Sequence, residues 1–103
     1  MGEISERVAA TVLFENNQVR VWDDRAAPGE TKDVHVHRRP YITVIIAGEQ
    51  GETVGEDGTV QRRFEGLTPG NAHYVGADEL PAVHAMRNTG SSELTVLIIE
   101  LLT

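Results

Sequence analysis

The sequence predicts an all-β single domain, built as a sandwich or barrel of short strands. Short β-branched and alternating segments follow one another along the chain, and Gly, Pro and Asn turn signals separate them. No sustained 3.6-residue repeat occurs, and only the first ten residues leave room for a helical turn. A chain of 103 residues has enough length for one core but not for two. We therefore expect residues 1–103 to form one domain, with 1–10 as a peripheral or exchanged segment.

The first half of the chain contains four predicted strands: 11–14, 19–22, 34–37 and 41–47. The first two flank the turn Glu-Asn-Asn, and Pro-Gly precedes the third. The third ends before Arg-Arg-Pro, where the proline cannot donate to a sheet ladder. The fourth is the β-branched run Ile-Thr-Val-Ile-Ile, which a glycine closes.

The second half contains five predicted strands: 52–54, 59–64, 71–75, 83–88 and 94–102. The first two bracket Gly-Glu-Asp-Gly, which is a strong hairpin signal. Pro-Gly precedes the third strand. The last two surround Asn-Thr-Gly-Ser-Ser, which indicates another hairpin turn.

Composition excludes several classes of function. The net charge of -7 disfavours nucleic-acid binding because an acidic surface repels phosphates. The chain has no cysteine, which excludes disulfides and zinc–thiolate sites and suits a reducing compartment. Its acidic start does not match a signal peptide, and its longest apolar runs are too short to span a bilayer. We expect a cytoplasmic protein with neither nucleic-acid nor membrane partners.

The chemistry-bearing residues of the sequence are its histidines. His35 and His37 project from the same face of a predicted strand, roughly 7 Å apart, so both can reach one metal ion. A third ligand must come from another strand, and His84 is the best candidate. The same pair beside Arg38 is also compatible with a solvated strand edge, since His-x-His occurs by chance. His73 alone is more typical of a half-buried polar residue.

The flanking residues add a family resemblance. The segment 29–48 resembles the first cupin motif, G-x5-H-x-H-x3-E-x6-G, with both glycines and both histidines at the family's spacing. Tyr41 stands where the family usually has Glu. His84 and Asn88 keep the H-x3-N spacing of the second motif, which Pro69-Gly70 opens. That second motif is three residues longer here, and Pro81 replaces its inner glycine.

The resemblance covers about residues 14–102 and implies an antiparallel double-stranded β-helix, a jelly-roll-like barrel. It implies that His35, His37 and His84 hold one divalent ion, Fe, Mn, Ni or Zn, inside the barrel. Cupins commonly dimerise, so we expect a homodimer, formed through the apolar 94–102 strand or through residues 8–14.

Three histidines without the glutamate resemble the iron sites of thiol dioxygenases and of a diketone-cleaving cupin. They also match the ligand count of three-histidine zinc sites. Tyr41 is our candidate for a proton-transfer residue or a partner of bound water, although simple packing explains it equally well. Five further residues are candidates for the pocket wall: Gln18, Trp22, His73, Tyr74 and Met86.

The leading functional hypothesis is a metal-dependent enzyme that acts on a small chelating metabolite. It would be either a dioxygenase or a Lewis-acid isomerase or lyase. The alternative is a non-catalytic module that binds or senses a sugar or another small ligand, because fold alone does not decide function. A metal-free barrel, whose histidines hydrogen-bond one another or a ligand, is a third possibility.

Overall fold

The computed structural model describes residues 4–103, which form nine β-strands and one short 3-10 helix. One antiparallel sheet has the order β1-β2-β9-β4-β7, and the other has the order β3-β8-β5-β6. The strands of the first sheet are β1 (Thr11–Glu15), β2 (Val19–Ala26), β4 (Tyr41–Ala47), β7 (Ala72–Val75) and β9 (Leu94–Leu101). Those of the second sheet are β3 (His35–His37), β5 (Gly51–Val54), β6 (Val60–Phe64) and β8 (Ala82–Asn88).

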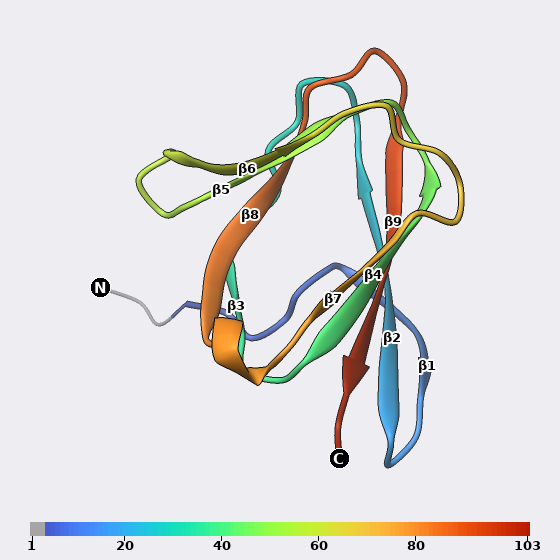
Figure 1. The fold of residues 1–103 in the computed structure, drawn as a ribbon, viewed down its shortest axis with the longest axis vertical. Helices are drawn as coiled ribbons and strands as arrows, with labels where there is room; N and C mark the ends of the chain where they lie inside the picture. Colours follow the sequence, from blue (N-terminus) through green and yellow to red (C-terminus); the bar gives the residue numbers. More distant parts are fainter. Residues whose placement is uncertain (1–3) are drawn as a thin grey trace.

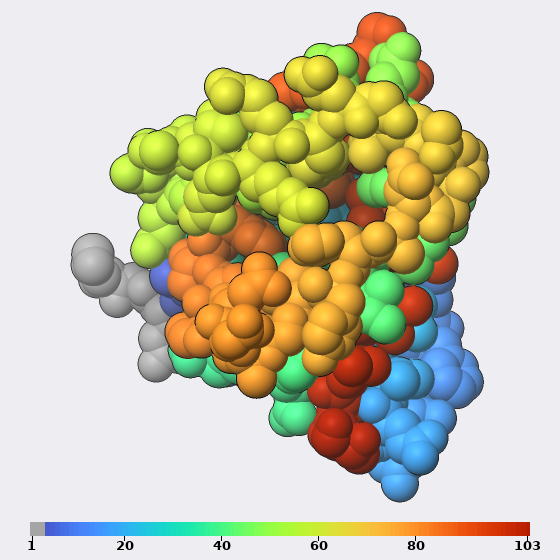
Figure 2. Space-filling model, in the orientation of Figure 1, coloured from blue at the N-terminus to red at the C-terminus, as the bar shows by residue number. Residues whose placement is uncertain are grey.

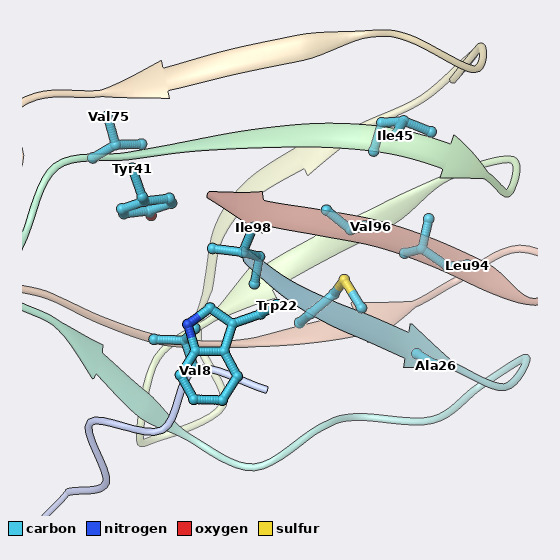
Figure 3. Packing of buried hydrophobic residues seen from close by; sticks show 10 residues of the cluster. Val8, Trp22, Ala26, Tyr41, Ile45, Val75, Leu94, Val96 and Ile98 are labelled. Atoms are coloured by element: carbon cyan, nitrogen blue, oxygen red, sulfur yellow. The ribbon is translucent and has the colours of Figure 1, made fainter. Parts of the chain in front are cut away.

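The core lies between the two sheets, which face each other across the molecule (Figure 1). Along β9, Leu94, Val96 and Ile98 are buried in this core, because alternate residues of a strand point to the same face. Figure 3 shows these side chains directed towards the same interior as Trp22 on β2. The alternation gives the larger sheet one interior face and one exterior face.

The glycines at the ends of the first cupin-like motif occupy backbone positions that favour glycine. Gly29 has φ of 81° and Gly48 has φ of 126°, both in the left-handed region. A Cβ on Gly48 would also lie 2.6 Å from Cδ1 of Leu94. The motif therefore marks the turn that ends β4 and the close approach of that turn to β9.

The predicted all-β fold is confirmed, and each of the nine predicted segments overlaps one strand. β2 differs most from its prediction, since it continues to Ala26 instead of ending at residue 22. Its ladder with β9 runs without interruption from Val19 opposite Leu101 to Ala26 opposite Leu94. The sequence analysis also did not predict the 3-10 helix η1 (Ala77–Glu79) between β7 and β8.

The N-terminal segment 1–10 lies partly outside the described residues, which begin at position 4. From residue 4 to residue 10 the chain forms no helix. Ser5 makes a parallel bridge to His35, and Val8 is buried in the core. Among the helices of residues 4–103, none is long and apolar enough to cross a membrane.

Candidate metal centre

Two neighbouring strands of the smaller sheet carry the three histidines. His35 and His37 lie on β3 and project from the same face, because they are two residues apart in a strand. The antiparallel register of β3 and β8 places His84 directly opposite His35. Cross-strand neighbours of this kind have Cβ atoms only about 5 Å apart. The topology thus brings a third imidazole to the pair, as the sequence spacing requires.

The three imidazoles form a compact cluster. One ligand atom from each of His35, His37 and His84 can be chosen so that all lie within 4.8 Å of one another. The Nε2 atoms of His35 and His37 are 3.0 Å apart. Two nitrogen ligands about 2.1 Å from an ion and at right angles to each other would lie about 3 Å apart. The separation therefore fits adjacent ligands of one metal ion.

For one of the two β3 histidines, a hydrogen bond to the backbone orients the ring as a metal ligand requires. His35 Nδ1 lies 3.2 Å from the carbonyl oxygen of Asp33, which assigns the proton to Nδ1 and leaves the Nε2 lone pair free for a metal. His37 Nδ1 is buried and has no hydrogen-bond partner among residues 4–103. The His37 ring is instead held by packing against an aromatic neighbour.

That neighbour is Tyr41, the first residue of β4. Its ring stacks on His37 with centroids 3.8 Å apart and 17° between the planes. Burial raises the pKa of the Tyr41 phenol to about 12, with a further raising effect from Glu79 and a lowering effect from Arg62. Tyr41 is therefore a neutral phenol at neutral pH, able to donate a hydrogen bond.

Burial also sets the protonation state of the histidines. It lowers the pKa of His37 to about 2, helped by repulsion from His35 and His84. It lowers the pKa of His84 to about 4 and that of His35 below its usual range. These lowered pKa values favour the neutral imidazole at neutral pH, and the neutral form is the one that ligates metals.

A cavity of about 560 Å³ opens beside the cluster. Its volume lies within the range of small-molecule sites. Figure 2 shows the surface hollowed between the β5–β6 hairpin and the segment containing β7 and η1. The cavity lining combines the histidine cluster and Tyr41 with apolar side chains and with eight further polar ones: Asp24, Thr43, Thr53, Gln61, Arg62, Asn71, His73 and Glu79.

The other candidate pocket residues divide into two groups. His73 and Met86 line the cavity. Tyr74 follows His73 in β7, so it points to the opposite face and is 57% exposed. Gln18 is exposed in the turn before β2 and does not contribute to the lining. Trp22 is buried in the core, outside the lining, and its Nε1 donates to Glu100 Oε1 at 2.5 Å.

Asn88, the last residue of the H-x3-N spacing, has a structural role. It is fully buried and its Nδ2 donates to the carbonyl oxygens of Ala26 at 2.9 Å and Ser92 at 2.8 Å. Its Oδ1 accepts from the Gly90 amide at 2.9 Å. Asn88 therefore fixes the β8–β9 turn and ties it to β2, at the far end of β8 from the histidine cluster.

Sequence reasoning did not identify three charged residues of the cavity lining, Asp24, Arg62 and Glu79. Asp24 shares the inward face of β2 with Trp22. Because alternate residues of a strand share a face, an inward-facing Trp22 would have predicted an inward-facing Asp24. Arg62 lies on β6, and its Nη1 is 2.7 Å from Nε2 of His73. No sequence pattern links Arg62 with His73, because only the pairing of β4 with β7 brings His73 to the cavity mouth.

No protein-family model matches the chain, but solved structures do. A cupin domain from Bordetella pertussis Tohama I is 22% identical with a TM-score of 0.74, and the match covers 97% of this chain and 98% of that one. A sugar phosphate isomerase of a cupin superfamily from Silicibacter pomeroyi DSS-3 is 19% identical with a TM-score of 0.55, over 84% of this chain and 52% of that one. The DMSP lyase DddQ from Ruegeria pomeroyi DSS-3 is 21% identical with a TM-score of 0.58, over 84% of this chain and 39% of that one.

These likenesses show the fold. The chain has the cupin double-stranded β-helix fold, as the motif resemblance implied. The two matched enzymes are longer than this chain, and the chain spans about half or less of each.

Proposed function

We propose that this cupin-fold chain binds one divalent metal ion through His35, His37 and His84 and is a metal-dependent enzyme. The observation that carries the proposal is the convergence of three neutral imidazoles, two buried and one half-buried, whose ligand atoms lie within 4.8 Å of one another beside a cavity of about 560 Å³. Fe, Mn, Ni and Zn all accept such nitrogen ligands. A bound ion would supply Lewis acidity that polarises an oxygen of a chelating substrate.

We propose Lewis-acid chemistry, an isomerisation or an elimination, as the reaction class. The matched sugar phosphate isomerase and DMSP lyase carry reactions of these two kinds on the same fold. Both classes need proton transfer as well as a polarised oxygen. The cavity lining offers three groups that can take part, the neutral phenol of Tyr41 and the carboxyl groups of Asp24 and Glu79; of these two carboxyl groups only that of Asp24 is buried.

The substrate that best fits the cavity is a small anionic metabolite. Among the described residues, Arg62 is the one guanidinium or ammonium group in the lining. His73 Nε2 accepts a hydrogen bond from Arg62, which orients the guanidinium at the mouth of the cavity. Arginine holds carboxylates and phosphates by paired hydrogen bonds. One end of the substrate would thus meet Arg62 and the other would reach the histidine cluster.

The test is a comparison of two activities in protein loaded with Fe²⁺ or Zn²⁺. Solvent deuterium exchange into a panel of hydroxy and keto acids and sugar phosphates, followed by NMR, detects isomerase and lyase chemistry. Oxygen consumption with diketones, thiols and catechols detects a dioxygenase. We expect deuterium incorporation that His84→Ala abolishes and Gln50→Ala retains. Oxygen consumption instead would identify the dioxygenase alternative, and inactivity with tight ligand binding would identify a binding module.

We also propose that the chain is a cytoplasmic homodimer. The absence of cysteine supports a reducing compartment. The outer face of the larger sheet supports self-association, because one register row places five apolar side chains side by side across all five strands: Phe14, Val21, Ile99, Ile42 and Tyr74. Phe14 and Tyr74 are more than half exposed. Contiguous apolar surfaces of this kind mark interaction sites.

A further inference from the structure

Asp24 is a buried carboxylate on the interior face of the larger sheet. It lies on β2 between Trp22 and Ala26, whose side chains Figure 3 shows along this strand in the core. Asp24 is only 4% exposed, yet it lines the cavity that also contains the histidine cluster. Its cross-strand partner Val96 is another lining residue. The strand register therefore fixes a carboxylate in the wall of the cavity.

Nothing in the described chain compensates this carboxylate directly. Within residues 4–103, Asp24 makes no ion pair and accepts no hydrogen bond, and charged groups act on it only from a distance. Burial raises the pKa of Asp24 to about 6, against a lowering effect of Lys32, and Asp23 and Glu30 raise it further. A buried carboxylate without partners destabilises a fold. Its presence is explained if it serves a ligand of the cavity.

Asp24 does not belong to the metal cluster itself. Among the described residues, the group whose ligand atoms all lie within 4.8 Å of one another consists of the three histidines alone. The carboxylate and the cluster thus occupy different parts of one cavity wall. A small molecule between them would contact the metal ligands on one side and the carboxylate on the other.

We propose that Asp24 is the proton acceptor of the cavity, for a ligand that carries a hydroxyl group and chelates the metal through oxygen. This inference rests on the proposed metal site. In the proton transfer, an O–H bond forms on a carboxylate oxygen of Asp24 and the ligand's O–H bond breaks. The electron pair of the broken bond stays on the ligand oxygen as an oxyanion. The step moves one proton and needs no oxidant or other reactant.

The test uses acetohydroxamic acid, a small chelator that loses one proton when it binds a metal, and protein loaded with Ni²⁺. Calorimetry in buffers of different ionisation enthalpy counts the protons released at about pH 7.5, where Asp24 is charged in the free protein. We expect the wild type to release almost no protons and Asp24→Asn to release about one per probe bound. The matched control is Asp23→Asn, which alters the neighbouring outward-facing carboxylate. Loss of the Asp23 charge lowers the pKa of Asp24, so Asp24 stays charged at this pH and proton release should be that of the wild type.

Infrared difference spectra give an independent measurement on the wild type. Addition of the probe should produce the C=O stretch of a protonated carboxyl group, and Asp24→Asn should lack this band. Equal proton release by the wild type and Asp24→Asn, with Ni²⁺ and probe bound to both, would overturn the inference and leave the metal site intact. Failure of the wild type to bind Ni²⁺ would overturn the proposed function and this inference with it.

Discussion

The phenol ring of Tyr41 lies stacked on the imidazole of His37, with the ring centroids 3.8 Å apart. Tyr41 occupies the position at which the first cupin motif usually has a glutamate. The chain therefore has an aromatic ring beside one histidine of the proposed metal site, where a glutamate would have supplied a fourth ligand with a negative charge. The stacking holds His37, whose Nδ1 has no hydrogen-bond partner among the described residues.

Tyr41→Phe should leave the metal site intact, because phenylalanine keeps the ring that stacks on His37. We expect the metal dissociation constant to change by less than about tenfold. By comparison, loss of a group that holds a metal ligand in place lowers metal affinity about 10- to 100-fold. Tyr41→Ala, which removes the ring, should show that larger loss. Competition titration with a chromophoric chelator measures both variants. A loss in Tyr41→Phe as large as in His84→Ala would mean that the phenol oxygen is itself a ligand.

Asn88→Ala should destabilise the fold without removing any ligand. The substitution deletes three hydrogen bonds of a fully buried side chain, to Ala26, Ser92 and Gly90. We expect the free energy of unfolding to fall by about 2–4 kcal/mol in urea titrations. The control is Gln50→Ala, which removes exposed contacts to Thr89 and should cost less than about 0.5 kcal/mol. A cost in Asn88→Ala as small as in the control would contradict its assigned role.

Asp24→Asn should stabilise the metal-free protein, and more so at higher pH. The pKa of Asp24 is about 6 in the fold, against 3.8 for an unperturbed aspartic acid, so the folded state binds more protons than the unfolded state between these values. Asp24 therefore lowers stability progressively as the pH rises through this window. The gain in unfolding free energy should be about 1 kcal/mol larger at about pH 8 than at about pH 5.

Urea titrations of both proteins at the two pH values measure this difference. The histidines are shared by wild type and variant, so their own titration cancels in the comparison. A gain that is equal at both pH values would show that the Asp24 carboxyl does not change its proton affinity on folding.

Ile99→Lys should disrupt the proposed homodimer. Ile99 is the central residue of the apolar row on the outer sheet face, between Val21 and Ile42. A buried lysine without a partner charge opposes association. Sedimentation velocity should find a dimer for the wild type and a monomer for Ile99→Lys, with Thr59→Lys on the β5–β6 hairpin as a dimeric control. A monomeric wild type would contradict the proposal.

The sequence contained most of the information that defines the histidine cluster. Strand alternation put His35 and His37 on one face, and the motif spacing pointed to His84, which the register places opposite His35. These features depend on short-range geometry, which the order of residues fixes. The strand boundaries followed from Gly, Pro and Asn turns for the same reason.

The rest of the cavity depends on pairing between distant strands. Whether the inward face of β2 carries Trp22 and Asp24 or their neighbours is set by its ladder with β9, which lies more than 60 residues further along the chain. Trp22 then fills the core and leaves Asp24 to the cavity. The stacking of Tyr41 on His37 likewise joins the two sheets, so no local pattern predicts it.

The central claim is that His35, His37 and His84 hold one metal ion, and elemental analysis of reconstituted protein tests it most directly. After incubation with Zn²⁺ and removal of unbound metal, the wild type and the His73→Ala control should retain about one equivalent per chain. The His35→Ala and His84→Ala variants should retain almost none. Less than about a tenth of an equivalent in the wild type, or equal retention in all four proteins, would contradict the account.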